Sequence, residues 1–467
     1  MKTSEYTKVP SINECLNIAT DTEEMIVRLG AIKELGPILV RMFPDVCTFL
    51  IADETTLNVA DAQGELTTSL SISSVEILGI TIFPAKPTLH ADYKYVKALA
   101  ADLKEKKVQA EKKGKTLVPI AIGGGTINDL TKRAAFEAGL LYFCVPTAAS
   151  VDGYTSYGAA LLSNGFKKTF ECPAPRAVIA DSSILSCAPA YLSSSGFGDL
   201  AGKIIAGTDW LIAETAGSGG ALGTEPINPL AWAMTQTGLR SALSRSQEAS
   251  KGNVQAIEIL FEALALTGFS MQYLKSSRPV SGCEHLFSHV WEMANLSMNG
   301  IPVTHGHKVA IGTLCATAIT EQFFSHVEAP KWIENSKSRE TVVREAEVRA
   351  AFLGQNAADD AVKTALDKLL DEKRAKALKE HISDEWGTLR IKVLNQLMPY
   401  NELRTMFKTA GCPITAEEIG LKRCEAIKTA YKAQMIRNRY TVLDLIWDYG
   451  LMETVLESVE ADKNYLT

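Results

Sequence analysis

The chain is 467 residues long, which is more than one hydrophobic core usually accommodates, so we expect two domains that share a cleft. Hydrophobic residues make up 46% and charged residues 22% of the sequence, a balance typical of a globular protein and not of a disordered one. The net charge is −6 and the sequence has no Lys/Arg-rich run, which argues against nucleic acid as the main partner.

Targeting signals are not expected in this sequence. Residues 1–17 mix charged residues with proline and have no long apolar core, so they do not resemble a signal peptide. The apolar stretches are too short or too interrupted to predict a membrane span. Nine cysteines are scattered singly without a CxxC spacing, which predicts reduced thiols and a cytoplasmic location. Cys283 is the exception among the cysteines, because it lies two positions before the candidate site residue His285.

Short β-rich runs alternate with helical patterns over the first 180 residues. The strand candidates are residues 46–52, 74–82, 117–122, 141–145 and 177–180. Helical patterns between them include residues 93–113 and 127–138. This alternation predicts a parallel, doubly wound sheet in an α/β domain of residues 1–184. The pair Asn164 and Gly165 predicts a hairpin with a type I′ turn over residues 158–170.

Helical periodicity continues from about Leu185 almost to the end, which predicts an all-α domain of residues 185–467. Residues 359–381 are expected to form one solvated amphipathic helix. Residues 216–229 are rich in Gly, Ser and Pro and are expected to form a loop.

A glycine-rich turn follows the strand candidate 117–122. Thr126 is a candidate N-cap with Asp129 three residues later, as in a capping box. Glycines at a strand–helix junction let the backbone approach a ligand, and the helix N-terminus favours phosphate. The alternative is a tight turn without a ligand. The turn matches neither GxGxxG nor the Walker A pattern, since Lys132 comes too late.

A second candidate ligand loop spans residues 146–153. It leaves the carboxyl end of the next strand, where open α/β sheets bind ligands. Its small residues and hydroxyls could line a ribose, and Asp152 would project a carboxylate toward the cleft. The alternative is that Asp152 and Gly153 only form a turn.

Four of the seven histidines fall within residues 283–307. His285 and His289 would share one face of a helix, and His305 begins another helical run. Two imidazoles and one carboxylate would leave an open position, as in a catalytic metal site. Asp199, at an expected glycine-rich helix start, is one candidate for the carboxylate, and Glu284 is the alternative. Unrelated core and surface histidines are the competing explanation.

These segments together resemble the sn-glycerol-1-phosphate dehydrogenase family, in the superfamily of iron-containing alcohol dehydrogenases, glycerol dehydrogenase and dehydroquinate synthase. The resemblance implies a Rossmann-like N-terminal domain, an all-α C-terminal domain and an active site between them. It rests on residues 123–129, 146–153, 177–181, 196–199, 209–210, 281–289, 305–309 and 437–445, in this order.

The resemblance assigns roles to individual residues. It implies that Asp199, His285 and His305 hold a divalent metal, usually zinc, with nickel or iron in some relatives. It implies that Asp152 and His289 contact substrate, together with Asp199. It also implies an NAD(H) or NADP(H) site that comprises Asp53 near the adenosine, Gly124, Gly125, Thr126, Ile127, Asn128, Asp129, Thr147, Ala148, Ala149, Ser150 and Ser156.

The expected activity is reduction of dihydroxyacetone phosphate to sn-glycerol 1-phosphate, a step of phospholipid biosynthesis, by a homo-oligomer without nucleic-acid partners. The alternatives are another polyol or glycerol dehydrogenase, a dehydroquinate-synthase-like cyclase, or a silent scaffold. Val151 and His307 depart from the family pattern, as does extra length at residues 216–253 and in the C-terminal helices. Lys203, one turn past Asp199, is more simply explained as a solvated lysine than as a phosphate ligand, and His307 as a surface or supporting residue.

Overall fold

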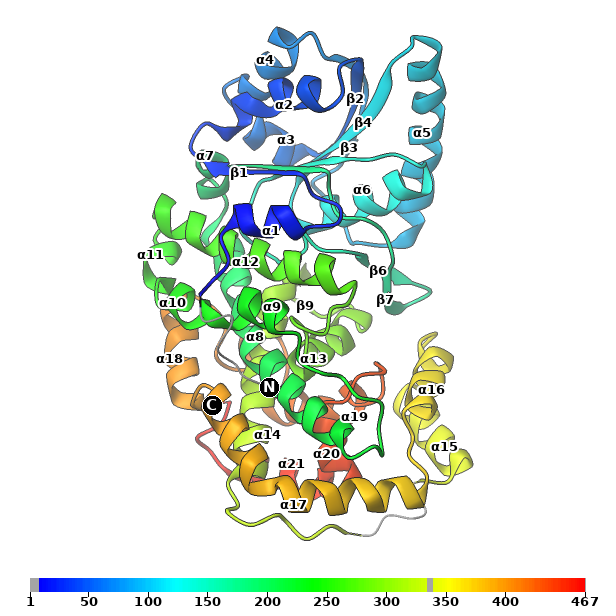
Figure 1. Cartoon of the computed structure of the whole chain (residues 1–467), viewed down its shortest axis with the longest axis vertical. Helices are drawn as coiled ribbons and strands as arrows, with labels where there is room; N and C mark the ends of the chain where they lie inside the picture. The colour runs from blue at the N-terminus through cyan, green and yellow to red at the C-terminus, as the bar shows by residue number, and fades with distance from the viewer. Residues whose placement is uncertain (1–7, 334–338, 467) are drawn as a thin grey trace.

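The computed structural model describes residues 8–333 and 339–466. A parallel six-stranded sheet with helices on both faces forms the upper part of the molecule in Figure 1, and a helical region forms the lower part. The expected fold class is therefore confirmed. The strands, in spatial order, are β1 (Glu24–Arg28), β8 (Ala177–Asp181), β5 (Phe143–Pro146), β4 (Thr116–Gly123), β2 (Val46–Asp53) and β3 (Glu76–Phe83).

Five of these strands lie within a few residues of the sequence predictions, and β1 is the one that sequence patterns missed. It is a five-residue strand with charged residues at both ends, so neither its length nor its pattern marks it as part of a sheet. It pairs with β8 in parallel, Glu24 opposite Ala177. The strand order reverses between β2 and β4, and ligands of such sheets bind outside the carboxyl ends of the strands at this point.

Alternation along the buried strands separates two apolar layers. Val118 and Ile120 pack with Leu39 on one face, whereas Leu117 and Ala121 pack with Leu99 on the other. The helices of the sheet region are α1 (Ile12–Ile18), η1 (Ala31–Glu34), α2 (Leu35–Met42), α3 (Glu54–Ala60), α4 (Glu65–Ile72), α5 (Tyr93–Lys112), α6 (Gly125–Glu137) and α7 (Ser182–Ser186).

The expected hairpin is confirmed as β6 (Ala159–Ser163) and β7 (Phe166–Phe170), which pair antiparallel. Asn164 and Gly165 have φ of 52° and 78°, and the left-handed backbone at both positions is what a type I′ turn requires. In Figure 1 the hairpin extends from the sheet region toward the helical region.

The helical region is built around α8, which runs for 29 residues and packs against α14 and α17. Its elements are α8 (Ala190–Ser218), α9 (Pro229–Trp232), η2 (Ala233–Thr237), α10 (Leu239–Leu243), α11 (Ser246–Ser250), α12 (Val254–Leu274), α13 (Cys283–Met293), β9 (Ser297–Met298), β10 (Ile301–Pro302), α14 (His305–Phe324), α15 (Thr341–Ala351), α16 (Ala358–Asp367), α17 (Glu372–Gln396), α18 (Tyr400–Ala410), η4 (Glu417–Ile419), α19 (Arg423–Ala433), α20 (Val442–Asp448) and α21 (Met452–Ala461).

Two local predictions in this region were wrong. Residues 359–381 do not form one helix, because Asp371 accepts the backbone N–H of Arg374 and so caps the start of α17. The expected loop at residues 216–229 is shorter, since α8 continues to Ser218 and Pro229 is the first residue of α9. The segments that follow, α9 to α11, pack against α8 and α12.

Among the described residues, α12 is the one helix that is long and apolar enough to cross a membrane. Core helices of soluble proteins pass the same test, and 61% of the apolar window of α12 is buried inside the molecule, against α7, α8 and η2 among others. We therefore describe α12 as a core helix.

Candidate metal and cofactor site

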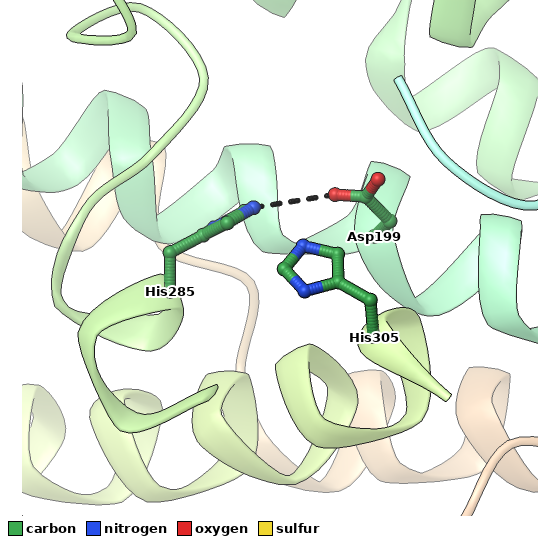
Figure 2. Close-up of side chains that lie close together, drawn as sticks. All are labelled: Asp199, His285 and His305. Atoms are coloured by element: carbon green, nitrogen blue, oxygen red, sulfur yellow. Dashed lines mark ion pairs between the residues drawn. The ribbon is translucent and has the colours of Figure 1, made fainter. Parts of the chain in front are cut away.

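Three helices of the lower region bring Asp199, His285 and His305 together. Asp199 lies on α8, His285 on the first turn of α13, and His305 is the first residue of α14. One potential ligand atom of each residue lies within 4.8 Å of the other two. The distance from His285 Nε2 to Asp199 Oδ1 is 3.3 Å, and Figure 2 shows the three side chains pointing toward one another.

Asp199 lies inside α8, so the expectation of a helix start at residue 199 was wrong. The helix begins at Ala190 and continues through Gly196 and Gly198. Tertiary packing overrides the low helix propensity of glycine here. A Cβ atom on Gly198 would lie 2.4 Å from the carbonyl oxygen of Gly306, so the backbones of α8 and α14 are in direct contact. This contact places the neighbouring residues, Asp199 and His305, beside each other.

Carboxylates orient both imidazoles. His285 Nδ1 lies 2.6 Å from Glu284 Oε1, and His305 Nδ1 lies 2.7 Å from Glu292 Oε1. With Nδ1 donating to a carboxylate, Nε2 carries the lone pair that a metal requires, as is usual for histidine ligands. Sequence reasoning considered Glu284 as a metal ligand. Its carboxylate instead contacts Nδ1 of His285, whereas the Nε2 atom of that ring faces Asp199. Sequence reasoning missed Glu292, which is on the helical face one turn past His289.

A buried lysine pairs with two carboxylates next to this group. Lys203 Nζ lies 2.7 Å from Asp199 Oδ1 and 2.7 Å from Asp152 Oδ2. The Lys203 side chain has no exposed surface, so the interpretation as a solvated lysine was wrong. Burial alone would raise the pKa of Asp199, but the charge of Lys203 and the adjacent imidazole of His285 hold that pKa well below its usual range. The backbone N–H of Asp152 also donates to Asp199 Oδ2 at 3.0 Å.

His289 lies beside the two candidate ligands without being part of their group. Its ring centroid is 6.2 Å from that of His285 and 6.3 Å from that of His305. The residue is only 8% exposed, and among the described residues its Nδ1 has no hydrogen-bond partner. Burial, and then the charge of Arg437, lower the pKa of His289 well below 6.5, so the imidazole is neutral.

His307 points away from the candidate ligands. Its Nε2 lies 2.7 Å from Ser194 Oγ, so the half-buried ring joins α14 to α8. Burial lowers the pKa of His307 to about 4. The sequence left two roles for His307, a surface residue or a supporting residue, and its contact with Ser194 corresponds to the second.

The glycine-rich turn joins β4 directly to α6. Gly124 is the N-cap and no side chain caps the helix, so the expected capping role of Thr126 was wrong. The helix starts one residue earlier than Thr126 because the strand ends at Gly123. A Cβ atom on Gly124 would meet no atom within 4 Å, so open space adjoins the uncapped N–H groups. This arrangement suits a phosphate group.

Asn128 and Asp129 follow this turn in α6, and their side chains bind backbone groups of a later segment. Asn128 is fully buried, its amide donates to the carbonyl of Gly153 at 3.0 Å, and it accepts from the hydroxyl of Tyr142 at 3.1 Å. Asp129 Oδ2 accepts the N–H of Ala160 at 3.3 Å. Asn128 thus holds the end of the second loop and Asp129 holds the backbone that follows it, and Ile127 is also buried.

Sequence reasoning missed Lys132, the buried cation of α6. Its ammonium group donates to the carbonyl oxygens of Gly153 at 2.9 Å, Ser156 at 3.0 Å and Gly158 at 3.0 Å. One side chain therefore fixes three carbonyls next to the second loop. The sequence carries no local signal for this role, because a lysine in a helical pattern is usually solvated.

The second loop is packed between α6 and α8. A Cβ atom on Gly125 would lie 2.7 Å from Val151 Cγ2, so the two loops are in contact. Tyr154 donates to the carbonyl of Ala148 at 2.7 Å. The other members of the expected cofactor set in this segment are also buried: Thr147, Ala149, Ser150 and Ser156.

Asp53 ends β2 and caps α3. Its Oδ1 accepts the N–H groups of Thr55 and Thr56, both at 2.9 Å. The hydroxyl of Thr56 donates to the carbonyl of Ile122 at 3.0 Å, so Asp53 lies beside the glycine-rich turn at the point where the strand order reverses.

Cys283 belongs to a separate buried group with Asp209 and Glu284. Asp209 accepts the N–H of Cys283 at 2.6 Å and that of Val442 at 2.7 Å, which joins the starts of α13 and α20. Burial raises the pKa of the Cys283 thiol well above its ordinary value, so the thiol stays protonated and inert.

The fold is that of the iron-containing alcohol dehydrogenases, a parallel sheet region followed by a helical region. The family model described as iron-containing alcohol dehydrogenase matches residues 26–189. A solved iron-containing alcohol dehydrogenase from Thermococcus thioreducens superposes with a TM-score of 0.56 at 15% identity, covering 94% of this chain and 98% of that one. A probable glycerol dehydrogenase from Sinorhizobium meliloti gives a TM-score of 0.55 at 16% identity, with the same coverage.

Curated relatives define the family more narrowly. The glycerol-1-phosphate dehydrogenase [NAD(P)+] of Bacillus licheniformis is 32% identical over 340 residues, which are 73% of this chain and 70% of that protein. The enzyme of the same name from Halalkalibacterium halodurans is 39% identical over 219 residues, or 47% of this chain and 52% of that protein. The chain belongs to the glycerol-1-phosphate dehydrogenase family. The resemblance expected from the sequence is confirmed, and this family consists of NAD(P)-dependent oxidoreductases.

Proposed function

We propose that this chain reduces dihydroxyacetone phosphate to sn-glycerol 1-phosphate with NADH or NADPH, using one divalent metal ion held by Asp199, His285 and His305. The observation that carries the proposal is the convergence of three ligand atoms within 4.8 Å, directly beside the Asp152 loop at the carboxyl end of the sheet. Relatives that carry this activity in their names support the substrate.

The donor set fits a catalytic metal ion. One carboxylate oxygen and two imidazole nitrogens suit zinc, nickel or iron(II), and we expect zinc. Three protein ligands leave a position for a substrate oxygen, as catalytic sites require. The carboxylates of Glu284 and Glu292 favour the tautomer in which Nε2 of each histidine is the ligand atom.

When bound, the metal would supply Lewis acidity at the substrate oxygen and the nicotinamide would supply the hydride. The uncapped N–H groups at the start of α6 would hold the cofactor pyrophosphate. Lys203 fixes the Asp152 carboxylate in position to bind a substrate hydroxyl. His289 is neutral, so its free Nδ1 can accept the hydroxyl proton in the oxidation direction and return it in reduction.

The test uses zinc-loaded and chelator-treated wild type together with Asp199→Ala and His285→Ala. We expect each variant to lose metal retention and NAD(P)H-dependent reduction of dihydroxyacetone phosphate together, the latter by more than about a hundredfold. His326→Ala, at an exposed histidine, is the matched control and should keep both. Full activity of Asp199→Ala or His285→Ala after metal removal would contradict the assignment.

Rival functions are separated by the same assay. A dehydroquinate-synthase-like cyclase would show no net consumption of NADH, because its bound cofactor is reduced and reoxidised within one catalytic cycle. A glycerol or polyol dehydrogenase would prefer glycerol and dihydroxyacetone to the phosphate ester. A silent scaffold would retain neither metal nor NAD. The choice between NADH and NADPH is read from the same assay, and the predicted homo-oligomer is checked by light scattering on the purified protein.

A further inference from the structure

The first turn of α13, which carries His285, is capped by a side chain from another helix. Gly282 is the N-cap of α13 and has no side chain to accept from the free N–H groups of the helix start. The N–H of Cys283 instead donates to Asp209 Oδ2 at 2.6 Å, and Asp209 lies on α8. Asp209 therefore replaces the missing cap of α13.

Glycine at position 282 makes room for this carboxylate. A Cβ atom there would lie 2.5 Å from Asp209 Oδ2 and 2.7 Å from Glu284 Oε2. The second oxygen of Asp209 accepts the N–H of Val442 at 2.7 Å, and the residue has no exposed surface. Asp209 cannot shift without loss of one of these two hydrogen bonds, so the start of α13 is fixed relative to α8.

Helix α8 thus determines the positions of two candidate ligands. It carries Asp199, and Asp209 follows ten residues later, about 15 Å along the same helix axis. A Cβ atom on Gly202, between these two residues, would lie 3.6 Å from His285 Cε1, so α8 also packs against the imidazole itself. The position of His285 relative to Asp199 is therefore set by this packing and by the Asp209 cap.

A second side chain holds the segment just before α13. Arg439, which follows α19, donates to the carbonyl of Ser281 and, at 2.8 Å, to the hydroxyl of Ser277. Arg439 thus binds the chain immediately before Gly282, whereas Asp209 binds it immediately after. The two charged side chains come from segments that lie far apart in the sequence, so this arrangement forms only in the folded chain.

We infer that Asp209 and Arg439 are positioning residues for the metal ligand His285, which they act on by holding the start of α13. The inference rests on the proposed function, because it requires that His285 binds the metal. Cys283 lies only two residues before His285 and in the same helix, so a shift of the helix start moves the imidazole as well. Ligand atoms must stay within about 0.5 Å of their productive positions, so a small shift is sufficient to weaken metal binding.

The competing explanation is a cap that only stabilises the fold. A purely structural cap predicts lower stability of the variants, together with unchanged metal affinity of the molecules that remain folded. Positioning predicts weaker metal binding by protein that is fully folded, and an altered arrangement of the ligands around the metal.

Asp209→Asn tests the inference, and Thr208→Val is its matched control. The asparagine has nearly the same shape but only one acceptor oxygen for the two N–H donors. Thr208 is the preceding residue of α8, is equally buried, and its hydroxyl donates to the carbonyl of Ile204 within the same helix at 2.9 Å. We expect the zinc affinity of the folded, metal-free chain to fall about tenfold or more in Asp209→Asn and to stay at the wild-type value in Thr208→Val.

Competition with a chromogenic chelator measures the zinc affinity, and circular dichroism at the same temperature establishes that each variant is folded. Arg439→Gln should weaken zinc binding in the same direction, which covers the case that Asp209→Asn folds poorly.

A second readout reports the ligand geometry directly. Cobalt(II) replaces zinc in the full chain, and its visible absorption bands depend on the arrangement of the ligands. We expect altered bands in Asp209→Asn and Arg439→Gln, and wild-type bands in Thr208→Val. Unchanged zinc affinity and unchanged cobalt bands in both variants would overturn the inference while the proposed function stands. A wild type that binds neither zinc nor cobalt would overturn the proposed function, and the inference with it.

Discussion

The histidines of the candidate metal site are each held by a carboxylate from α13. Glu284 is the sequence neighbour of His285, and Glu292 reaches from the last turn of α13 to the first residue of α14. Such partners fix the tautomer and the ring orientation of a ligand, and they also raise its basicity. Removal of one carboxylate should therefore weaken metal binding without removal of a ligand.

Glu284→Gln isolates this effect. We expect the affinity of the metal-free protein for zinc to fall about tenfold to a hundredfold, because the amide oxygen is a weaker acceptor for His285 Nδ1–H. Competition with a chromogenic chelator measures the affinity. Glu402→Gln, at an exposed glutamate of α18, should leave it unchanged. An unaltered zinc affinity of Glu284→Gln would show that the carboxylate does not orient the ligand.

Two lysines show how single residues differ from their expected roles. Lys132 and Lys203 occur in helical patterns where a lysine is usually solvated, yet both side chains are fully buried. Each is stabilised by acceptors that lie far away in the sequence or on another element: three carbonyls for Lys132, and Asp152 for Lys203.

At the scale of elements, the contact between α8 and α14 determines the geometry of the site. Gly198 and Gly306 allow the two backbones to touch, and a Cβ atom on Gly306 would lie 1.7 Å from the carbonyl oxygen of Ser195. No side chain fits at these positions without separation of the helices. Because Asp199 and His305 are the residues next to these glycines, any separation also moves the ligand atoms apart.

Gly198→Ala should therefore destabilise the protein by about 1–3 kcal/mol through overpacking, and should lower zinc affinity as well. The control is Gly387→Ala on α17, where a Cβ atom would meet nothing within 4 Å. That substitution should be neutral or stabilising by up to about 1 kcal/mol, because alanine favours helices. Urea unfolding measures both effects, and equal behaviour of the two variants would refute the close-contact explanation.

At the scale of the whole molecule, the sheet region and the helical region meet at the site. The N–H of Asp152, in a loop of the sheet region, donates to Asp199 of α8, and Lys167 of the hairpin reaches Glu292 of α13. Ligands that bind here contact both regions, so binding and global stability are linked.

The acid stability of the whole chain depends in part on His307. Burial lowers the pKa of this imidazole from 6.5 to about 4, so the unfolded chain takes up its proton at a higher pH than the folded chain. The resulting stability is complete above pH 6.5 and is lost as the pH falls toward 4. Relative to wild type, His307→Gln should lose about 1–3 kcal/mol less of its free energy of unfolding across this window.

Urea titrations at a series of pH values check this prediction. His326→Gln removes an exposed histidine and should follow the wild-type profile. Parallel profiles for wild type and His307→Gln would mean that His307 protonates equally in the folded and unfolded chains.

The sequence alone determined the parallel sheet, the helical second half, the β6–β7 hairpin and the family. Strand and helix periodicity and the Asn164–Gly165 turn are local signals, and the order of the family motifs can be read directly from the sequence. Local patterns failed where the partners of an element lie far away in the sequence. The three cases are the short strand β1, the glycine-containing interior of α8 and the uncapped start of α6.

Only the tertiary structure decided which side chains support the candidate ligands. Glu292 has no distinctive spacing relative to Asp199, and Lys132 has none relative to the second loop, so their roles depend on contacts between elements. Burial also decided charge states that spacing cannot indicate, such as the neutral His289 and the ion-paired Lys203. The physical reason is that desolvation and long-range pairing are properties of the packed chain and not of any segment.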